Sequence, residues 1–137
     1  MGLYLCIFDG DDEIDGVEVG PYADFGSLRQ YITKELEGGK GGSVFPTFIL
    51  HSDCDGEWAA SECVFLGLEL QKIEEEMKRR PPIPFVSDWQ KEVAKSHGIV
   101  PTSAFESFID VDGQKLLKRI RGLIALGIER GLPILFQ

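Results

Sequence analysis

The stretch Cys63-Val-Phe-Leu-Gly-Leu-Glu-Leu-Gln-Lys-Ile-Glu-Glu-Glu-Met77 carries the clearest structural signal in the chain. Apolar residues recur in it at steps of three and four, which is the spacing of one face of an α-helix. They are Cys63, Leu66, Leu70, Ile73 and Met77. We therefore expect an amphipathic helix that buries this face against another element. The three prolines within residues 79–84 should end it in a stiff connector.

Three further helices are expected on the same grounds. Apolar residues from Phe25 to Leu36 repeat at helical spacing behind Asp24, a suitable N-cap, and the glycines of 38–42 end that pattern. A short helix should run from Ser87 to Lys95. The last helix should open at Asp110-Val-Asp-Gly113, bury a broad apolar face from Leu116 to Ile128 and stop at Gly131.

Three short apolar runs are typical of β-strands. They are Leu3–Phe8, Val44–Leu50 and Leu132–Phe136. Val17-Glu-Val19 alternates and could add a short extended segment. Because a helix joins the first two runs, we expect them to pair in parallel within a mixed sheet.

These elements predict one α+β domain over residues 1–137. It would hold a small mixed sheet of about three to four strands packed against amphipathic helices, in the order β-α-β-α-(α)-α-β. A chain of 137 residues is long enough to bury a core without disulfides or metal. Residues 79–104 are the one stretch that resembles an insertion.

The charge is unevenly distributed along the chain. The net charge is −9, with −13 in residues 1–76 and +4 in residues 77–137. An acidic surface repels phosphate backbones, so we expect no direct binding of nucleic acid, whereas encounter with a cationic partner would be accelerated. Lys118-Arg119 and Arg121 form a short basic cluster, which we interpret as the solvated face of a helix.

Several classes of protein are disfavoured. The cysteines, Cys6, Cys54 and Cys63, are few and odd in number, which indicates reduced thiols. No apolar run approaches the roughly 18–20 residues of a membrane span, and the first residues lack the basic start of a signal peptide. We therefore expect a cytoplasmic protein with no membrane partner.

Three acidic segments could carry chemistry: 9–15, 53–57 and 110–112. If the strands before the first two are parallel neighbours, both segments emerge at one edge of the sheet. The calcium-loop pattern that starts at Asp11 fails because its twelfth position is Tyr22. His51, Asp53 and Cys54 could ligate zinc, but no second pair of ligands accompanies them. We expect no metal and no cofactor.

No catalytic motif is recognisable. The nucleophile elbow, the phosphate-binding loop and the dinucleotide fingerprint are all missing from the sequence. His51 ends an apolar run, and Cys54 lies between two aspartates, which opposes its use as a nucleophile. Trp58 follows an acidic loop and is a candidate for the rim of a binding surface.

Three parts of the chain resemble a bacterial family of immunity proteins from polymorphic toxin systems, the immunity protein 70 family. They are Met1–Gly10 with Asp15–Gly20, then His51–Trp58 with Glu62-Cys63 and Leu70, and finally Phe108–Gly113 with Gly131–Gln137. The resemblance implies an α+β fold and a non-enzymatic inhibitor that binds and neutralises a cognate toxin. Ala59 departs from the helix-capping residue expected at its position.

Charge and resemblance together suggest an acidic partner-binding face. A toxin that acts on nucleic acid, such as a nuclease, needs a basic channel, which carboxylates can occupy in place of phosphate. The predicted contact residues are Asp11, Asp12, Glu13, Asp15, Glu18, Asp53, Asp55, Glu57 and Trp58. One alternative is a metal-dependent enzyme that uses the loops 9–15 and 53–57. Another is a module that binds a peptide at an edge strand beside Pro133.

Overall fold

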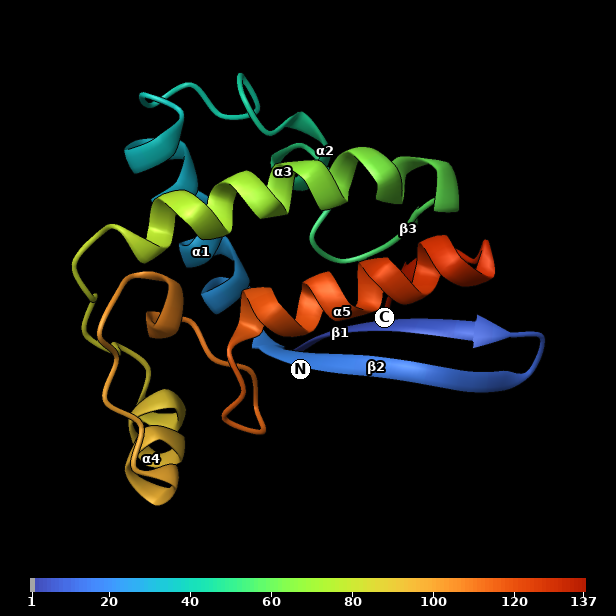
Figure 1. The fold of residues 1–137 in the computed structure, drawn as a ribbon. Coiled ribbons are helices and arrows are strands. Elements are labelled where there is room, and N and C mark those ends of the chain that lie inside the picture. The colour runs from blue at the N-terminus through green and yellow to red at the C-terminus, as the bar shows by residue number, and fades with distance from the viewer. Residues whose placement is uncertain (1) are drawn as a thin grey trace.

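Four strands form one antiparallel sheet; the helix Leu116–Arg130 packs against it, and the helix Ala60–Lys78 packs on that helix (Figure 1). The computed structural model describes residues 2–137. The elements in chain order are β1 (Gly2–Asp9), β2 (Asp12–Pro21), α1 (Tyr22–Leu36), α2 (Pro46–Ile49), β3 (Glu57–Trp58), α3 (Ala60–Lys78), α4 (Asp88–His97), a 3₁₀ turn (Phe105–Ser107), α5 (Leu116–Arg130) and β4 (Ile134–Phe136). The α+β class is confirmed. The strand order is β2-β1-β4-β3 and every pairing is antiparallel, so the expected parallel pair is wrong.

The acidic segment after β1 is a hairpin and not a long loop. Asp9 pairs with Asp12, which leaves Gly10 and Asp11 as the two-residue turn. Gly10 has φ 65°, the positive value that such a turn requires and that glycine adopts without strain. The chain therefore returns at once along β1, and the residues expected to form the rest of the loop become the start of β2.

The expected strand over 44–50 is wrong, because Pro46–Ile49 forms the short helix α2. Proline suits the first helical position, where its missing N–H costs nothing. The carboxylate of Glu69 on α3 accepts hydrogen bonds from the backbone N–H groups of Thr47, at 3.2 Å, and Phe48, at 3.0 Å. A side chain more than 20 residues away thus satisfies the free donors at the start of this helix.

The amphipathic helices are confirmed with small shifts at their ends. α3 buries all five residues of the predicted apolar stripe. Its start has no capping hydroxyl, and the Glu62 carboxylate accepts a hydrogen bond from the backbone N–H of Ala59 instead. α5 begins at Leu116, later than the expected start near Gly113, because the backbone of 108–115 forms a bridge in which Ile109 pairs with Lys115. α1 begins at Tyr22, ahead of the expected cap Asp24.

One face of the sheet, here called the inner face, joins the main core. Leu3, Leu5 and Ile7 point from β1 toward α5 and α3 and are fully or almost fully buried. The two helices approach closely near their ends: an added Cβ on Gly127 of α5 would lie 3.6 Å from the Cys63 sulfur and 3.6 Å from Ile7. Glycine at this position lets α5 pack tightly between α3 and the sheet.

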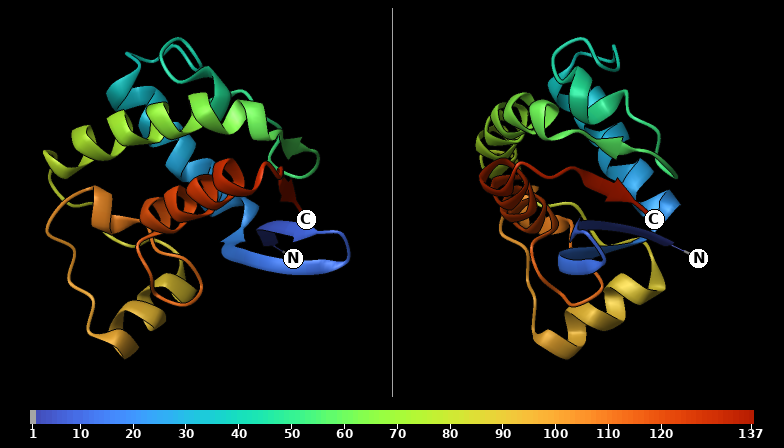
Figure 2. Two further views of the ribbon diagram at one scale, coloured as in Figure 1. Left: turned by 45° about the vertical axis from the view of Figure 1, so that its right-hand side comes forward. Right: turned by 90° about the vertical axis from the view of Figure 1, so that its right-hand side faces the viewer.

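The opposite face of the sheet, here called the outer face, carries a different set of side chains. Directly paired residues share a face, and alternate residues of a strand return to it. Pairing therefore assigns to the outer face Tyr4, Cys6, Phe8, Glu13, Gly16, Glu18, Leu135 and Glu57. Figure 2 shows α5 and α3 on the other side of the strands.

Within residues 2–137, neither border of the sheet presents a long edge strand with all its backbone groups free. β3 has only two residues. At the β2 border, the Glu18 carbonyl accepts a hydrogen bond from the Val111 backbone N–H at 3.0 Å, and the Gly16 carbonyl accepts one from Arg119 at 2.8 Å. β4 lies between β1 and β3, so the expected edge strand beside Pro133 is an interior strand.

The segment 79–104 is anchored to the rest of the fold at its middle. The Trp89 indole N–H and the Ser87 hydroxyl donate hydrogen bonds to the Asp24 carboxylate at 2.8 and 2.6 Å. Gly98 ends α4 in the left-handed conformation, as its position predicts. That the segment is an insertion stays a prediction.

Candidate functional site

The predicted acidic residues of the hairpin are exposed around its turn and on the outer face. Asp11, Asp12 and Glu13 are exposed at the end of the hairpin, and Glu18 is exposed further along β2. Glu13 pairs with Phe8, and Glu18 pairs with Tyr4. Aromatic and acidic side chains therefore alternate across the two strands on one surface.

Tyr4 is linked to this acidic surface through its hydroxyl. Burial, a hydrogen bond with Glu13 and the negative charge of that carboxylate together raise the pKa of Tyr4 to about 12. The ring packs over Gly16, where an added Cβ would clash with the Tyr4 hydroxyl group. Gly16, which pairs with the buried Cys6, thus makes room for the tyrosine ring.

Asp15 does not belong to this surface. It pairs with Ile7 and therefore points to the inner side of the sheet. Its carboxylate lies 3.7 Å from the Arg119 guanidinium on α5 and accepts a hydrogen bond from the Gly16 backbone N–H at 2.8 Å. Asp15 thus has a structural partner, in contrast to the role predicted for it.

The second acidic loop lies at the other end of the sheet from the hairpin turn. The structure shows that it precedes a strand, β3, that runs in the same direction as β1. Glu57 is level with Cys6, so Asp53 and Asp55 extend away from the turn at 10–11. The expected meeting of the two loops at one edge is wrong. Glu57 alone, exposed on the outer face, lies on the same surface as Glu13 and Glu18.

The separation of the two acidic loops argues against the alternative of a metal-dependent enzyme, which would need both loops at one site. Across residues 2–137, the structure shows no group of three or more histidine, cysteine, aspartate or glutamate side chains placed to hold a metal ion. His51 hydrogen-bonds through its ring nitrogens to the carbonyls of Ser52 and Glu57 and stacks on Phe136, with ring centroids 4.2 Å apart. It has a packing role at the end of the sheet.

Trp58 is a core residue, and its predicted place at a binding rim is wrong. Its side chain is 0% exposed, between Phe48 and Phe136. The indole N–H donates a hydrogen bond to the Thr47 carbonyl at 3.0 Å. The aromatic residues available to a partner on the sheet are the half-buried Tyr4 and Phe8.

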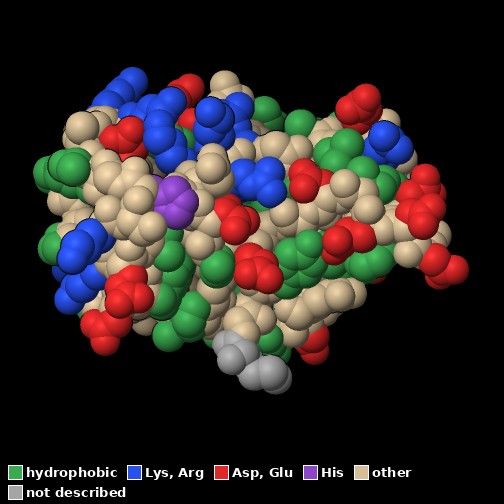
Figure 3. Space-filling model, turned by 90° about the horizontal axis from the view of Figure 1, so that it is seen from below, with side chains coloured by type: hydrophobic (Ala, Val, Ile, Leu, Met, Phe, Trp, Pro, Cys, Tyr) green, Lys and Arg blue, Asp and Glu red, His purple; other side chains and the backbone are tan. Residues whose placement is uncertain are grey.

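The outer face is consequently a mixed apolar and acidic surface. It contains three carboxylates, from Glu13, Glu18 and Glu57, and no lysine or arginine. Figure 3, which views the molecule from the hairpin side, shows acidic and hydrophobic side chains next to each other over this half of the molecule. Such a surface fits a protein partner that presents positive charge around an apolar centre.

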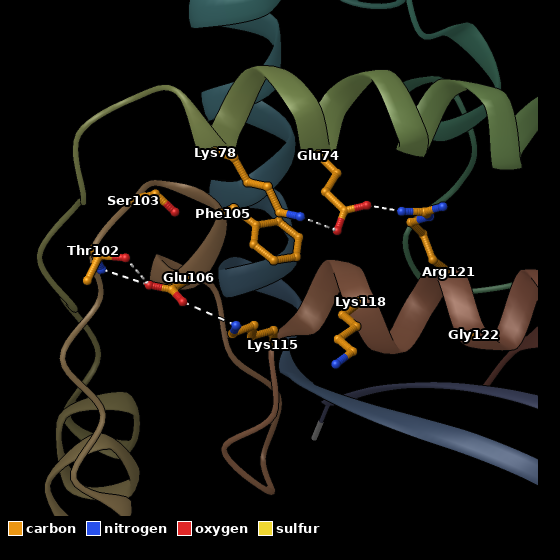
Figure 4. A pocket seen from close by; sticks show the side chains of 10 residues that line it. All are labelled: Glu74, Lys78, Thr102, Ser103, Phe105, Glu106, Lys115, Lys118, Arg121 and Gly122. Atoms are coloured by element: carbon orange, nitrogen blue, oxygen red, sulfur yellow. Dashed lines mark hydrogen bonds and ion pairs between the residues drawn. The ribbon is translucent and has the colours of Figure 1, made fainter.

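A basic cavity of about 650 Å³ was not expected from the sequence. It opens between the C-terminal half of α3, the first two turns of α5 and the segment 102–106 (Figure 4). The lining residues are Glu74, Lys78, Thr102, Ser103, Phe105, Glu106, Lys115, Lys118, Arg121 and Gly122. The only sequence signal is the basic cluster at 118–121, which by its spacing alone predicts the solvated face of a helix.

Ion pairs organise the wall of this cavity. Lys78 lies 3.3 Å from the Glu74 carboxylate, and Arg121 reaches the same carboxylate from the opposite helix. Lys115 lies 3.1 Å from the Glu106 carboxylate. Hydrogen bonds from the Thr102 hydroxyl and backbone N–H, together with Lys115, lower the pKa of Glu106 to about 2.

Comparison with known proteins gives one match. The family model described as Immunity protein 70 matches residues 3–136. No curated protein and no solved structure matches the chain significantly. In addition, no helix within residues 2–137 has the length and apolar character needed to cross a membrane.

Proposed function

Because the chain belongs to the immunity protein 70 family, we propose that it is a non-catalytic inhibitor that binds and neutralises a cognate bacterial toxin inside the cell that makes both. The observation that carries this proposal is the family match, which spans residues 3–136. The fold, the charge and the outer face support a particular way of binding.

The toxin would dock on the outer face and the adjoining hairpin turn. The acidic contacts would come from the turn residues Asp11 and Asp12 and from Glu13, Glu18 and Glu57, and the apolar ones from Tyr4, Phe8 and Leu135. This surface joins half-buried aromatic rings with exposed carboxylates. Apolar contacts at the centre would hold the complex, while the carboxylates would increase the rate of encounter and select a basic partner.

A toxin that acts on nucleic acid is the partner class that fits this charge. Its active site must attract phosphate groups, so it presents lysine and arginine side chains. Carboxylates from the outer face would pair with those side chains and exclude the substrate. Inhibition would then need no reaction catalysed by the immunity protein.

Co-expression in bacteria tests the proposal. The toxin domain encoded next to the gene for this chain is induced with and without the chain, and survival and one-to-one complex formation are measured. Protection by the wild-type chain supports the function, and its loss on Glu13→Lys/Glu18→Lys supports the surface. Glu75→Lys is the matched control, because Glu75 is exposed on α3, away from the outer face. Full toxicity in the presence of the folded wild-type chain would contradict the function.

A further inference from the structure

The basic cavity between α3 and α5 has an excess of positive charge. Four cationic side chains line it, against two carboxylates. Lys78 and Arg121 share the single charge of Glu74, and Lys115 pairs with Glu106. Within residues 2–137, Lys118 has no ion-pair partner. The lining therefore carries a net charge of +2 in a chain whose overall charge is −9.

The start of α5 adds to this positive potential. Its N-cap, Lys115, makes no side-chain capping hydrogen bond, and its first turn contains no acidic residue. The N-terminal end of a helix has a partial positive charge, at which anions are stabilising and cations are not. Lys115 is compensated there by its ion pair with Glu106. Lys118 adds a positive charge in the first turn, where the helix itself disfavours it, and a bound anion would compensate that charge.

The cations come from α3 and from the start of α5, and the segment 102–106 supplies the carboxylate of Glu106. Figure 4 shows Lys78 and Arg121 approaching Glu74 from α3 and α5, and Glu106 between Thr102 and Lys115. Glu74 is 9% exposed and Phe105 is 3% exposed, so the wall behind the charges is well packed. Lys78, Lys115 and Arg121 are therefore held in place by ion pairs against a packed wall, as a preorganised binding site requires.

We propose that this cavity binds a small ligand through a phosphate group. A phosphate monoester carries a charge of about −1.5 to −2 at pH 7, which matches the excess of two positive charges, whereas a single carboxylate would leave it half compensated. Lysine and arginine are common partners of phosphate oxygens. A volume of about 650 Å³ lies within the usual range of small-molecule sites. The cavity and the hairpin turn lie at opposite ends of α5 (Figure 1), so this site is separate from the proposed toxin surface.

Inorganic phosphate is the probe for the test. The ¹⁵N-labelled chain is titrated with phosphate at pH 7.5 and constant ionic strength, and the amide shifts of residues 115–122 are followed. We expect saturable shifts with a millimolar dissociation constant. Acetate, the monovalent comparison, should bind at least tenfold more weakly than phosphate. Linear shifts, or equal effects of acetate and phosphate, would overturn the proposal.

Two variants connect binding to the cavity. Lys118→Ala removes an exposed side chain without an ion pair, so the fold should persist, and we expect at least a threefold weaker affinity. Lys78→Gln, on the opposite wall, should weaken binding similarly. Lys91→Ala is the control: it removes an exposed lysine of α4, outside the cavity, and should bind phosphate as the wild type does. Unchanged affinity in both cavity variants would refute the assignment.

Discussion

The carboxylate of Glu37 lies 2.9 Å from the backbone nitrogen of Phe45 and accepts its hydrogen bond. The same side chain accepts hydrogen bonds from the backbone N–H groups of Val44, at 2.9 Å, and Gly42, at 3.0 Å. Burial by itself would raise the pKa of Glu37, but these backbone hydrogen bonds outweigh it and lower the pKa below its usual value. One buried carboxylate thus organises the glycine-rich turn between α1 and α2.

Replacing Glu37 should therefore destabilise the fold. Glu37→Ala leaves three backbone donors without their charged acceptor, and we expect a loss of about 2–3 kcal/mol in the free energy of unfolding. Urea denaturation monitored by circular dichroism measures it. Glu75→Ala, an exposed change on α3, should stay within about 0.5 kcal/mol of the wild type. Equal stability of the two variants would show that the turn does not depend on Glu37.

Glu106 should make stability depend on pH in acid. Its pKa of about 2 in the folded chain lies below the usual value of 4.5. Its contribution is therefore fully present above about pH 4.5 and is lost as the pH falls toward 2. In denaturation experiments between pH 2 and 5, Glu106→Gln should show a smaller slope of stability against pH than the wild type. Thr102→Val, which removes the hydroxyl donor, should lie between them, and identical slopes would contradict the assignment.

Trp58 should be important for stability and not for toxin binding. Trp58→Phe removes part of a fully buried ring and the hydrogen bond to the Thr47 carbonyl, so we expect a loss of about 2 kcal/mol. Chemical denaturation gives the stability, and calorimetric titration of the folded variant gives its affinity for the toxin. A stable variant that binds the toxin weakly would show that Trp58 contributes to the interface.

Tyr4 reports on the electrostatics of the outer face. With a pKa of about 12, its hydroxyl should remain protonated at pH 11, where an ordinary tyrosine is mostly ionised. Glu13→Gln removes a charge that disfavours the tyrosinate, so it should lower the pKa of Tyr4, and the remaining burial should keep it above 10. The ¹³C shift of the Tyr4 ring, followed from pH 8 to pH 12, checks both values. A wild-type Tyr4 that is ionised at pH 11 would contradict its burial, and a pKa unchanged by Glu13→Gln would rule out the contact with Glu13.

Association with the toxin should depend on salt. If the carboxylates of the outer face guide the encounter, raising salt from about 50 to 500 mM should slow association at least tenfold. Stopped-flow fluorescence measures the rate. Glu13→Lys/Glu18→Lys should slow association at low salt and reduce its salt dependence, because Coulomb attraction is then weaker. A rate that does not change with salt would remove the electrostatic part of the proposed binding mode.

Local periodicity was sufficient to predict the four longer helices, α1, α3, α4 and α5, and two of the strands. The stripe from Cys63 to Met77 and the run Leu3–Phe8 each contain their own apolar pattern, and both bury one face in the core. Their secondary structure can therefore be predicted from the local sequence. Residues 44–50 were misassigned because distant side chains decide their conformation. Glu69 and Glu37 accept their backbone hydrogen bonds, and neither contact can be inferred from the apolar run itself.

The candidate site was only partly predictable for the same reason. Acidic character located the exposed residues Asp11 to Glu13 and Glu18, but it could not show that Asp15 faces Arg119, which is more than 100 residues away. Trp58 was ambiguous, since tryptophan is common in both interfaces and cores. The cavity depends on side chains from α3, α5 and the 102–106 segment, and their meeting is a property of the tertiary structure.

The modified borders of the sheet restrict how any partner can engage it. A segment that joins a sheet as an extra strand needs a continuous row of free backbone donors and acceptors. Here one border offers only the two residues of β3, and the Val111 N–H and the Arg119 guanidinium occupy the middle of the other. The same features protect the chain from polymerising through its own strands. A partner that binds the sheet would therefore have to contact its side chains, so specificity could change by single substitutions while the backbone stays the same.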